Sequence, residues 1–277
     1  MSVVAEAVAS DRLGGRVWLY SNYHCNLACT YCLTESAPSA ARRELDPALM
    51  LRAAHEAARL GFTDLGVTGG EPFLLPSMPA LLADLAEILP TLVLSNGTLF
   101  GEGRLARLAP LIGRPVAVQI SLDAPDPATN DAQRGDSTYA KVVDAIPRLV
   151  DLGIRVRVAT TLDEDGLDDE GHARLCELHR SLGVPDEDHI VRPVLRRGRA
   201  GERGRGTDLP HSALPPELTL TTDGAFWSPF GPTVRQGALD TDLLVTRTIL
   251  PLDVPACALL ELVDGLPRGA DARIGIR

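Results

Sequence analysis

Strand-like and helix-like segments alternate six times over the first two-thirds of the chain. The strand-like segments are short and apolar or alternating, and helix-like segments separate most of them. The expected strands are 16–22, 63–72, 91–98, 114–125, 154–163 and 186–195. The expected helices are 44–61, 76–89, 102–113, 137–153 and 168–183. This alternation favours an α/β fold with a parallel sheet and right-handed crossovers, either open or closed into a barrel.

Glycine-rich and polar sequences stand where the expected strands end. They are a three-cysteine cluster after 16–22, then Gly69-Gly70-Glu71-Pro72, Ser95-Asn96-Gly97, Ser121-Leu122-Asp123 and Arg192. In parallel α/β folds, ligands bind at the carboxyl ends of the strands. We therefore expect these residues to line one rim.

The character of the sequence changes near residue 200. Residues 201–277 begin with a Gly-, Pro- and Arg-rich stretch and continue as a small α+β extension. A hairpin is expected to turn at Asp223-Gly224, and an apolar helix is expected within 256–265. The domain prediction is an N-terminal extension at 1–15, a core at 16–200 and a C-terminal extension at 201–277.

Composition excludes several classes of protein. The chain has 277 residues, 45% hydrophobic and 23% charged, which suits one packed domain with an appendage. A formal net charge of −10 argues against nucleic acid as the main partner. No apolar run is long enough to span a bilayer, and the N-terminus lacks a basic signal sequence. A cytoplasmic protein with no membrane or nucleic-acid partner is expected.

The five cysteines are unevenly placed. Cys25, Cys29 and Cys32 form a C-x3-C-x2-C motif, which is unlike the spread of an even-numbered disulfide scaffold. Three thiolates on a short loop can ligate three irons of a [4Fe–4S] cube and leave the fourth iron open to an exogenous ligand. The motif therefore predicts a metal site made by these three residues.

This motif, Tyr31 just before its last cysteine, and GGEP about 40 residues later resemble the signature of the radical S-adenosylmethionine (radical SAM) superfamily. The resemblance covers roughly residues 15–200. It implies a partial (β/α)6 TIM-type barrel, one [4Fe–4S] cluster and S-adenosylmethionine as cofactors. It also implies reductive cleavage of that cofactor to a 5′-deoxyadenosyl radical, which abstracts hydrogen from a substrate. A flavodoxin- or ferredoxin-type reductant would supply the electron.

The resemblance assigns roles to the other rim residues. Gly69 and Gly70 would approach the S-adenosylmethionine amine, Glu71 would accept from its ammonium, and Pro72 would fix the turn. Tyr31 would lie by the adenine edge, and Arg134 would pair with the cofactor carboxylate. The remaining cofactor-binding candidates, which lie on turns or at the close of the barrel, are Ser95, Asn96, Ser121, Asp123 and Arg192. The alternative for Ser95, Asn96, Ser121 and Asp123 is a turn or cap role, and the alternative for Arg134 is a surface arginine.

The C-terminal extension resembles a SPASM or twitch domain without its auxiliary-cluster cysteines. Ser228 and Pro229 stand where a cysteine is expected. Phe226 and Trp227 either pack the extension or line the substrate mouth. The arginines within 192–205 form either a solvated linker or a lid that carries cations toward an anionic substrate.

The substrate is expected to be a small natural-product precursor or a peptide, with oxidation, epimerisation or rearrangement as the reaction. A peptide would need a separate presenting protein, because no leader-recognition domain precedes residue 16. A substrate radical can take hydrogen from a thiol, and the candidate donors are Cys257 and Cys176. Cys176 is more typical of a structural thiol.

Two readings from other classes remain. The first is a noncatalytic iron–sulfur electron carrier or scaffold, against which the GGEP motif and the polar rim argue. The second is a zinc-binding module in which His24 completes the three thiols. Formation of 5′-deoxyadenosine separates the enzyme from the carrier, and a brown chromophore separates both from a zinc protein.

Overall fold

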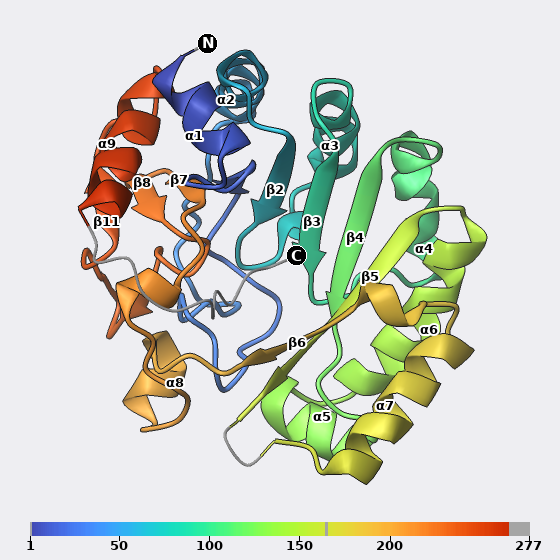
Figure 1. The fold of residues 1–277 in the computed structure, drawn as a ribbon. Coiled ribbons are helices and arrows are strands. Elements are labelled where there is room, and N and C mark those ends of the chain that lie inside the picture. Colours follow the sequence, from blue (N-terminus) through green and yellow to red (C-terminus); the bar gives the residue numbers. More distant parts are fainter. Residues whose placement is uncertain (1, 164–165, 266–277) are drawn as a thin grey trace.

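The computed structural model describes residues 2–163 and 166–265, and it shows one nine-stranded sheet with helices packed against it (Figure 1). The strands run in the order β11-β8-β7-β1-β2-β3-β4-β5-β6. The six strands that come first in the sequence are β1 (Arg16–Tyr20), β2 (Asp64–Thr68), β3 (Thr91–Ser95), β4 (Val116–Ser121), β5 (Arg155–Leu162) and β6 (His189–Pro193). They pair in parallel and in sequence order, which confirms the expected parallel sheet.

The sheet is curved but open. Within the described residues, its edge strands β6 and β11 (Leu244–Thr246) do not pair with each other. The architecture is therefore a partial TIM-type barrel, as expected, and not a closed one. Trp18, Leu65, Val93, Val118 and Val158 come from consecutive strands and are fully buried in its core.

The helices follow the strands as the alternation predicts. Those of the core are α2 (Pro47–Leu60), α3 (Met78–Ala86), α4 (Glu102–Leu105), α5 (Pro127–Arg134), α6 (Thr138–Asp151) and α7 (Asp169–Ser181). Asp46 caps α2 by accepting from the backbone nitrogen of Ala48, and Gly61 ends it in a left-handed conformation. The expected helix 102–113 is α4 followed by a 3-10 turn, Ala106–Leu111, because Pro110 has no backbone N–H to extend an α-helix.

The C-terminal extension continues the sheet. β7 (Leu218–Thr221) pairs in parallel with β1, and β8 (Gly224–Trp227) returns antiparallel to it, so the expected hairpin forms. The expected apolar helix is α9 (Asp253–Asp264), which packs beside the N-terminal helix α1 (Val3–Ala9) (Figure 1). The chain after β6 also contains helix α8 (Gly198–Glu202) and a short antiparallel pair, β9 (Val234–Arg235) and β10 (Ala238–Leu239).

Among the described residues, no helix combines the length and hydrophobicity needed to cross a bilayer.

Candidate active site

Three cysteines of the loop between β1 and α2 face one small cavity. Cys25, Cys29 and Cys32 all line a hollow of about 180 Å³, here called the thiol cavity. Among the described residues, no group of three or more His, Cys, Asp or Glu side chains is arranged to hold a single metal ion. The three thiols line one shared space, as ligands to three irons of a cube would.

The sulfur atoms already have hydrogen-bonding neighbours. Cys25 Sγ accepts from Leu27 N at 3.3 Å and from Asn96 Nδ2 at 3.6 Å, and Thr34 Oγ1 lies 3.6 Å from Cys32 Sγ. Burial, and then the charge of Glu71, raises the pKa of the Cys25 thiol to about 12. A coordinating metal deprotonates its thiols. The donor set therefore fits a cationic iron cluster, whose charge would offset the cost of a buried thiolate at Cys25 and of partly buried thiolates at Cys29 and Cys32.

A second hollow of about 210 Å³, here called the outer cavity, adjoins the thiol cavity. Both are lined by Cys29, Cys32, Thr68, Gly69, Leu94, Ser121 and Arg134. The outer cavity adds an aromatic residue, Tyr31, and an apolar wall from β6 and the extension. Members of that wall include Val194, Leu195, Pro229 and Phe230. The two hollows together suit an extended organic ligand that contacts the thiols at one end.

Gly69 and Gly70 allow the turn after β2 to pack directly on the backbone that enters the cysteine loop. A Cβ atom at Gly70 would lie 2.2 Å from the carbonyl oxygen of His24, and one at Gly69 would lie 2.6 Å from that of Asn22. Gly70 N donates to Asn22 O at 2.7 Å. Both glycines also line the thiol cavity. Because these glycines lack side chains, their peptide backbone lies directly against the thiol cavity. Their contact with a cofactor remains a prediction.

Glu71 is completely buried and lines neither cavity. Its carboxylate accepts from Phe73 N at 3.0 Å, from Ser95 Oγ at 3.0 Å and from Asn96 N at 2.7 Å. Burial raises the pKa of Glu71 to about 7, although these donors oppose that shift. Its position gives no support to direct contact with a cofactor ammonium. Glu71 instead holds Ser95 and Asn96, which do line the thiol cavity, and Pro72 begins the short helix beside them.

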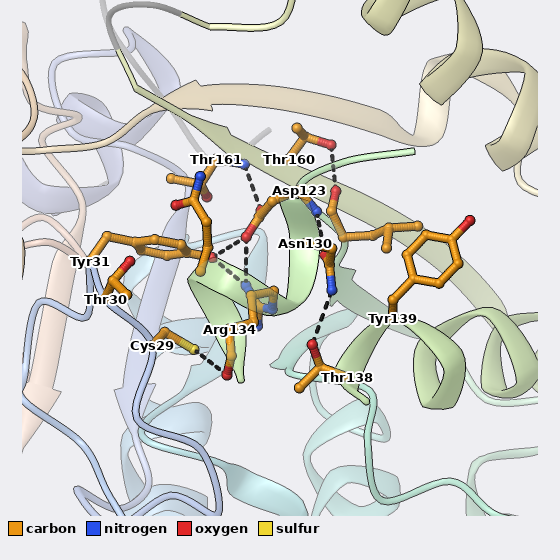
Figure 2. Close-up of polar contacts among 12 residues, drawn as sticks. Cys29, Thr30, Tyr31, Asp123, Asn130, Arg134, Thr138, Tyr139, Thr160 and Thr161 are labelled. Carbon is orange, nitrogen blue, oxygen red and sulfur yellow. Dashed lines mark hydrogen bonds and ion pairs between the residues drawn. The ribbon is translucent and has the colours of Figure 1, made fainter. Parts of the chain in front are cut away.

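Asp123 organises the rim of the outer cavity (Figure 2). Its carboxylate accepts from Tyr31 Oη, from Thr161 N at 2.9 Å and from Arg134 Nη1 at 3.1 Å. Asn130 accepts from Asp123 N, so the turn after β4 is fixed on both sides. In this structure Arg134 is paired with Asp123, while it still lines both cavities. Its expected pairing with a cofactor carboxylate remains a prediction.

Arginines after β6 hold the cysteine loop from outside. Arg199 donates to the carbonyl oxygens of Cys29, at 2.5 Å, and Ser36, at 3.1 Å, and its backbone nitrogen donates to Cys32 O at 2.9 Å. Arg205 bonds to Thr30 on the same loop and forms an ion pair with Asp163. Both side chains bind protein groups, although that of Arg205 is 32% exposed. These contacts support neither the solvated linker nor the cationic lid for Arg199 and Arg205.

The remaining candidates lie apart from the two cavities. Cys257 is exposed on α9, and Cys176 lies on α7, 3.7 Å from His172 Nε2. Neither thiol lines a cavity of the site, so their positions give no support to hydrogen donation. His24 also lines neither cavity, which leaves the zinc alternative without its fourth ligand.

Several cavity residues escaped the sequence analysis. Phe226 and Trp227 are buried in the core, and it is Phe230, three residues later, that lines the outer cavity. Thr161, Val194 and Leu195 lie on or just after β5 and β6. Their one sequence signal is a position near the end of a strand, which a motif search does not use.

Comparisons with known proteins agree with this site. A family model described as the radical SAM superfamily matches residues 19–178. The antilisterial bacteriocin subtilosin biosynthesis protein AlbA of Bacillus subtilis is 31% identical over 147 residues, which are 52% of this chain and 32% of AlbA. A PqqA peptide cyclase of Xanthomonas oryzae is 30% identical over 142 residues, which are 51% of this chain and 36% of the cyclase.

A solved structure supports the fold. Streptococcus suis SuiB, crystallised with S-adenosylmethionine, superposes with a TM-score of 0.57 at 16% identity, over 68% of this chain and 43% of SuiB. The chain spans about a third of the length of the two curated relatives, since the matches cover 32% and 36% of them.

Proposed function

The chain belongs to the radical SAM superfamily, and from that premise we propose that it is an enzyme that binds a [4Fe–4S] cluster through Cys25, Cys29 and Cys32. When bound, the cluster and S-adenosylmethionine would together supply the one-electron chemistry that yields a 5′-deoxyadenosyl radical for hydrogen abstraction. The protein's part is to hold both groups, orient them and exclude water.

One observation carries this proposal. The three thiols, the glycine turn, the polar ends of β3 and β4 and Arg134 of α5 all line one cavity, although the sequence separates Cys25 from Arg134 by 109 positions. An electron carrier needs cysteines but no such polar cradle. The continuous second cavity, lined by Tyr31 and apolar side chains, supports a bound organic cofactor.

The chain's own residues have separate tasks at this site. Asn96 donates to the Cys25 sulfur, and Glu71 fixes Asn96. Asp123 holds Tyr31 and Arg134 on the rim of the outer cavity. Phe230, from the extension, covers part of that cavity and so limits the entry of water.

A peptide precursor is the substrate class that we favour. The support comes from the relatives described above, a bacteriocin biosynthesis protein and a peptide cyclase. The proposed partners are a flavodoxin- or ferredoxin-type reductant and a separate protein that presents the peptide. The five free cysteines accord with the reducing cytoplasm, where we place the enzyme.

The test is anaerobic reconstitution followed by reduction with dithionite in the presence of S-adenosylmethionine. Wild-type protein should bind four irons per chain and produce 5′-deoxyadenosine, measured by mass spectrometry. Alanine at Cys25, Cys29 or Cys32 should abolish both results. Serine at Cys257 is the matched control, since this thiol lies outside the site, and it should leave both unchanged.

Two outcomes would reject the proposal. Iron binding without any 5′-deoxyadenosine would support the noncatalytic carrier or scaffold. A colourless protein that binds zinc in place of iron would support the zinc module.

A further inference from the structure

A cavity of about 420 Å³, here called the basal cavity, lies at the amino ends of β1 to β5, opposite the arrowheads that mark their carboxyl ends (Figure 1). Arg16, Asp64 and Arg155 line it, and each is the first residue of its strand. Arg157 on β5 and Arg114 just before β4 also line it. A five-residue strand such as β2 is about 17 Å long, so this cavity is separate from the candidate active site.

Positive charge dominates the lining of the basal cavity, which includes four arginines and one aspartate. The aspartate, Asp64, forms an ion pair with Arg16. Arg114 forms an ion pair with Glu87, which does not line the cavity, and these two side chains are 43% and 58% exposed. Because such an exposed ion pair contributes little free energy, Arg114 can exchange Glu87 for a ligand that offers more negative charge.

Arg157 lacks a hydrogen-bond partner at its Nε atom, which is buried. Asp188 Oδ1 lies 3.5 Å from this atom, but both oxygens of Asp188 already accept from Arg155, at 2.7 Å and 3.1 Å. Burial lowers the pKa of Arg157, the charge of Asp188 opposes this shift, and the charges of Arg16 and Arg155 add to it. One carboxylate thus serves two guanidinium groups, and Arg157 can accept a second anionic partner.

The chemistry of the lining indicates which ligand the basal cavity would take. A guanidinium binds a phosphate through two parallel hydrogen bonds, and several guanidinium groups around one space favour a ligand with more than one negative charge. Other parts of the wall are apolar and suit an organic group; they are Pro90, Leu92, Pro115 and Val116. The volume also lies in the range of small-molecule sites, roughly 300–1,000 Å³.

We propose that the basal cavity binds a small organic phosphate through Arg157 and Arg114. None of its lining residues lines the thiol cavity or the outer cavity, so this site goes beyond the proposed function. A small ligand fits better than an acidic protein surface. The reason is that the Arg157 side chain is only 12% exposed, and a group that reaches it must enter between the strand ends.

The experiment is calorimetric titration of reconstituted protein that is saturated with S-adenosylmethionine, which keeps the outer cavity occupied. The probes are uridine 5′-diphosphate, uridine, which lacks the phosphates, and pyrophosphate, which lacks the organic part. The variants are Arg157→Gln, Arg157→Lys and Arg114→Gln. The matched control is Arg180→Gln, because Arg180 forms an exposed ion pair with Asp186 and does not line the cavity.

Wild-type protein and Arg180→Gln should bind uridine 5′-diphosphate equally, and neither should bind uridine. Arg157→Gln and Arg114→Gln should each weaken binding by about tenfold to a hundredfold, the range for a lost charge-assisted contact, and Arg157→Lys should retain part of the affinity. Absence of binding to wild type, or equal affinity in all variants, would overturn the proposal. Pyrophosphate that binds as tightly as uridine 5′-diphosphate would overturn the assignment to an organic ligand.

Thermal unfolding separates a ligand contact from a purely structural role of Arg157. Uridine 5′-diphosphate should raise the unfolding midpoint of wild type and not that of Arg157→Gln. An equal rise in both proteins would make Arg157 structural and would overturn the proposal. Arg114→Gln, which alters an exposed side chain, keeps the test valid if Arg157→Gln does not fold. Binding of a poly-glutamate peptide without binding of uridine 5′-diphosphate would replace the small ligand by an acidic protein partner.

Discussion

Single buried carboxylates hold the rim of this site together. Asp123 and Arg134 have side chains that are 2% and 5% exposed, so each neutralises a charge that water does not reach. Removing one partner of such a pair leaves the other charged and buried. Residues of this kind affect stability even where a cofactor role is also expected.

We expect Asp123→Asn to lower the free energy of unfolding by about 3–5 kcal/mol, because Arg134 loses its counter-charge. Guanidinium chloride denaturation of the reconstituted protein would measure this loss. Asp144→Asn is the control, since Asp144 pairs with Arg148 on the surface, and it should cost about 1 kcal/mol or less. Equal losses in the two variants would contradict the buried-pair argument.

Glu217 lies at the opposite end of the barrel and gives a pH-dependent prediction. Burial raises its pKa from 4.5 to about 7, although Trp18 Nε1 donates to its carboxylate. The folded state then binds a proton between pH 4.5 and 7 that the unfolded state has lost. This group therefore stabilises the fold less as the pH rises through that window.

Glu217→Gln, which is neutral at every pH, should be more stable than wild type at pH 8 by on the order of 2–3 kcal/mol. The difference should shrink toward pH 4.5, and urea denaturation between pH 5 and pH 8 would show it. Glu177 lies on the exposed face of α7. The unfolding free energy of Glu177→Gln should therefore change with pH in the same way as that of wild type. If the unfolding free energy of Glu217→Gln also followed that of wild type at every pH, the raised pKa of Glu217 would be contradicted.

At the scale of elements, helix α8 fixes the position of the cysteine loop. Its Gly198 has a φ of +51°. A Cβ atom there would lie 2.2 Å from Leu33 O. The close approach lets Arg199 reach two carbonyl oxygens of the loop. The loop is therefore held by a segment more than 160 residues away, since Arg199 and Ser36 are 163 positions apart.

We expect Arg199→Gln to speed the loss of iron to a chelator by about tenfold or more, because charged hydrogen bonds contribute about 1.5–3 kcal/mol each. The rate is followed by absorbance of the iron–chelator complex. Arg199→Lys should rescue part of the effect, and exposed Arg203→Gln on the same segment should have none. Iron loss at the wild-type rate would show that α8 does not hold the loop.

The core elements were predictable because their signals are local. Strands β1 to β6 and helix α2 follow from apolar patterning and from the Asp46-Pro47 and Gly61 caps. Helix α5 was missed although Asp126-Pro127 and Gly135 mark its ends, because its sequence is largely polar. The role of Arg199 was not predictable, since nothing in a glycine- and arginine-rich stretch indicates which distant carbonyls it contacts.

At the candidate site, too, residues with a local sequence signal were predictable and residues placed by long-range packing were not. Short motifs identified the cysteines, the glycine turn and the residues after β3 and β4. The inward-facing position of Glu71 depends on packing, which no local sequence pattern encodes.

For the molecule as a whole, the extension is structurally continuous with the core. β7 pairs with β1, and Leu218, Leu220 and Leu259 belong to the same apolar core as the barrel strands. The expected boundary near residue 200 therefore falls within one packed unit.

A chain that ends after residue 206 should accumulate as insoluble protein, because β1 would lose its partner and apolar core surface would be exposed. Soluble yield and circular dichroism would measure this. Supplying 207–277 as a second polypeptide should restore solubility. A truncated chain that stays soluble and unfolds cooperatively would instead support two independent domains.

The pairing of β1 with β7 joins residue 17 to residue 218. During translation, the ribosome has synthesised most of the polypeptide before the first strand gains this neighbour. Arg199 also emerges late, so the nascent cysteine loop is exposed and unsupported for most of synthesis. The cysteine loop therefore reaches its folded position only after α8 and β7 have left the ribosome.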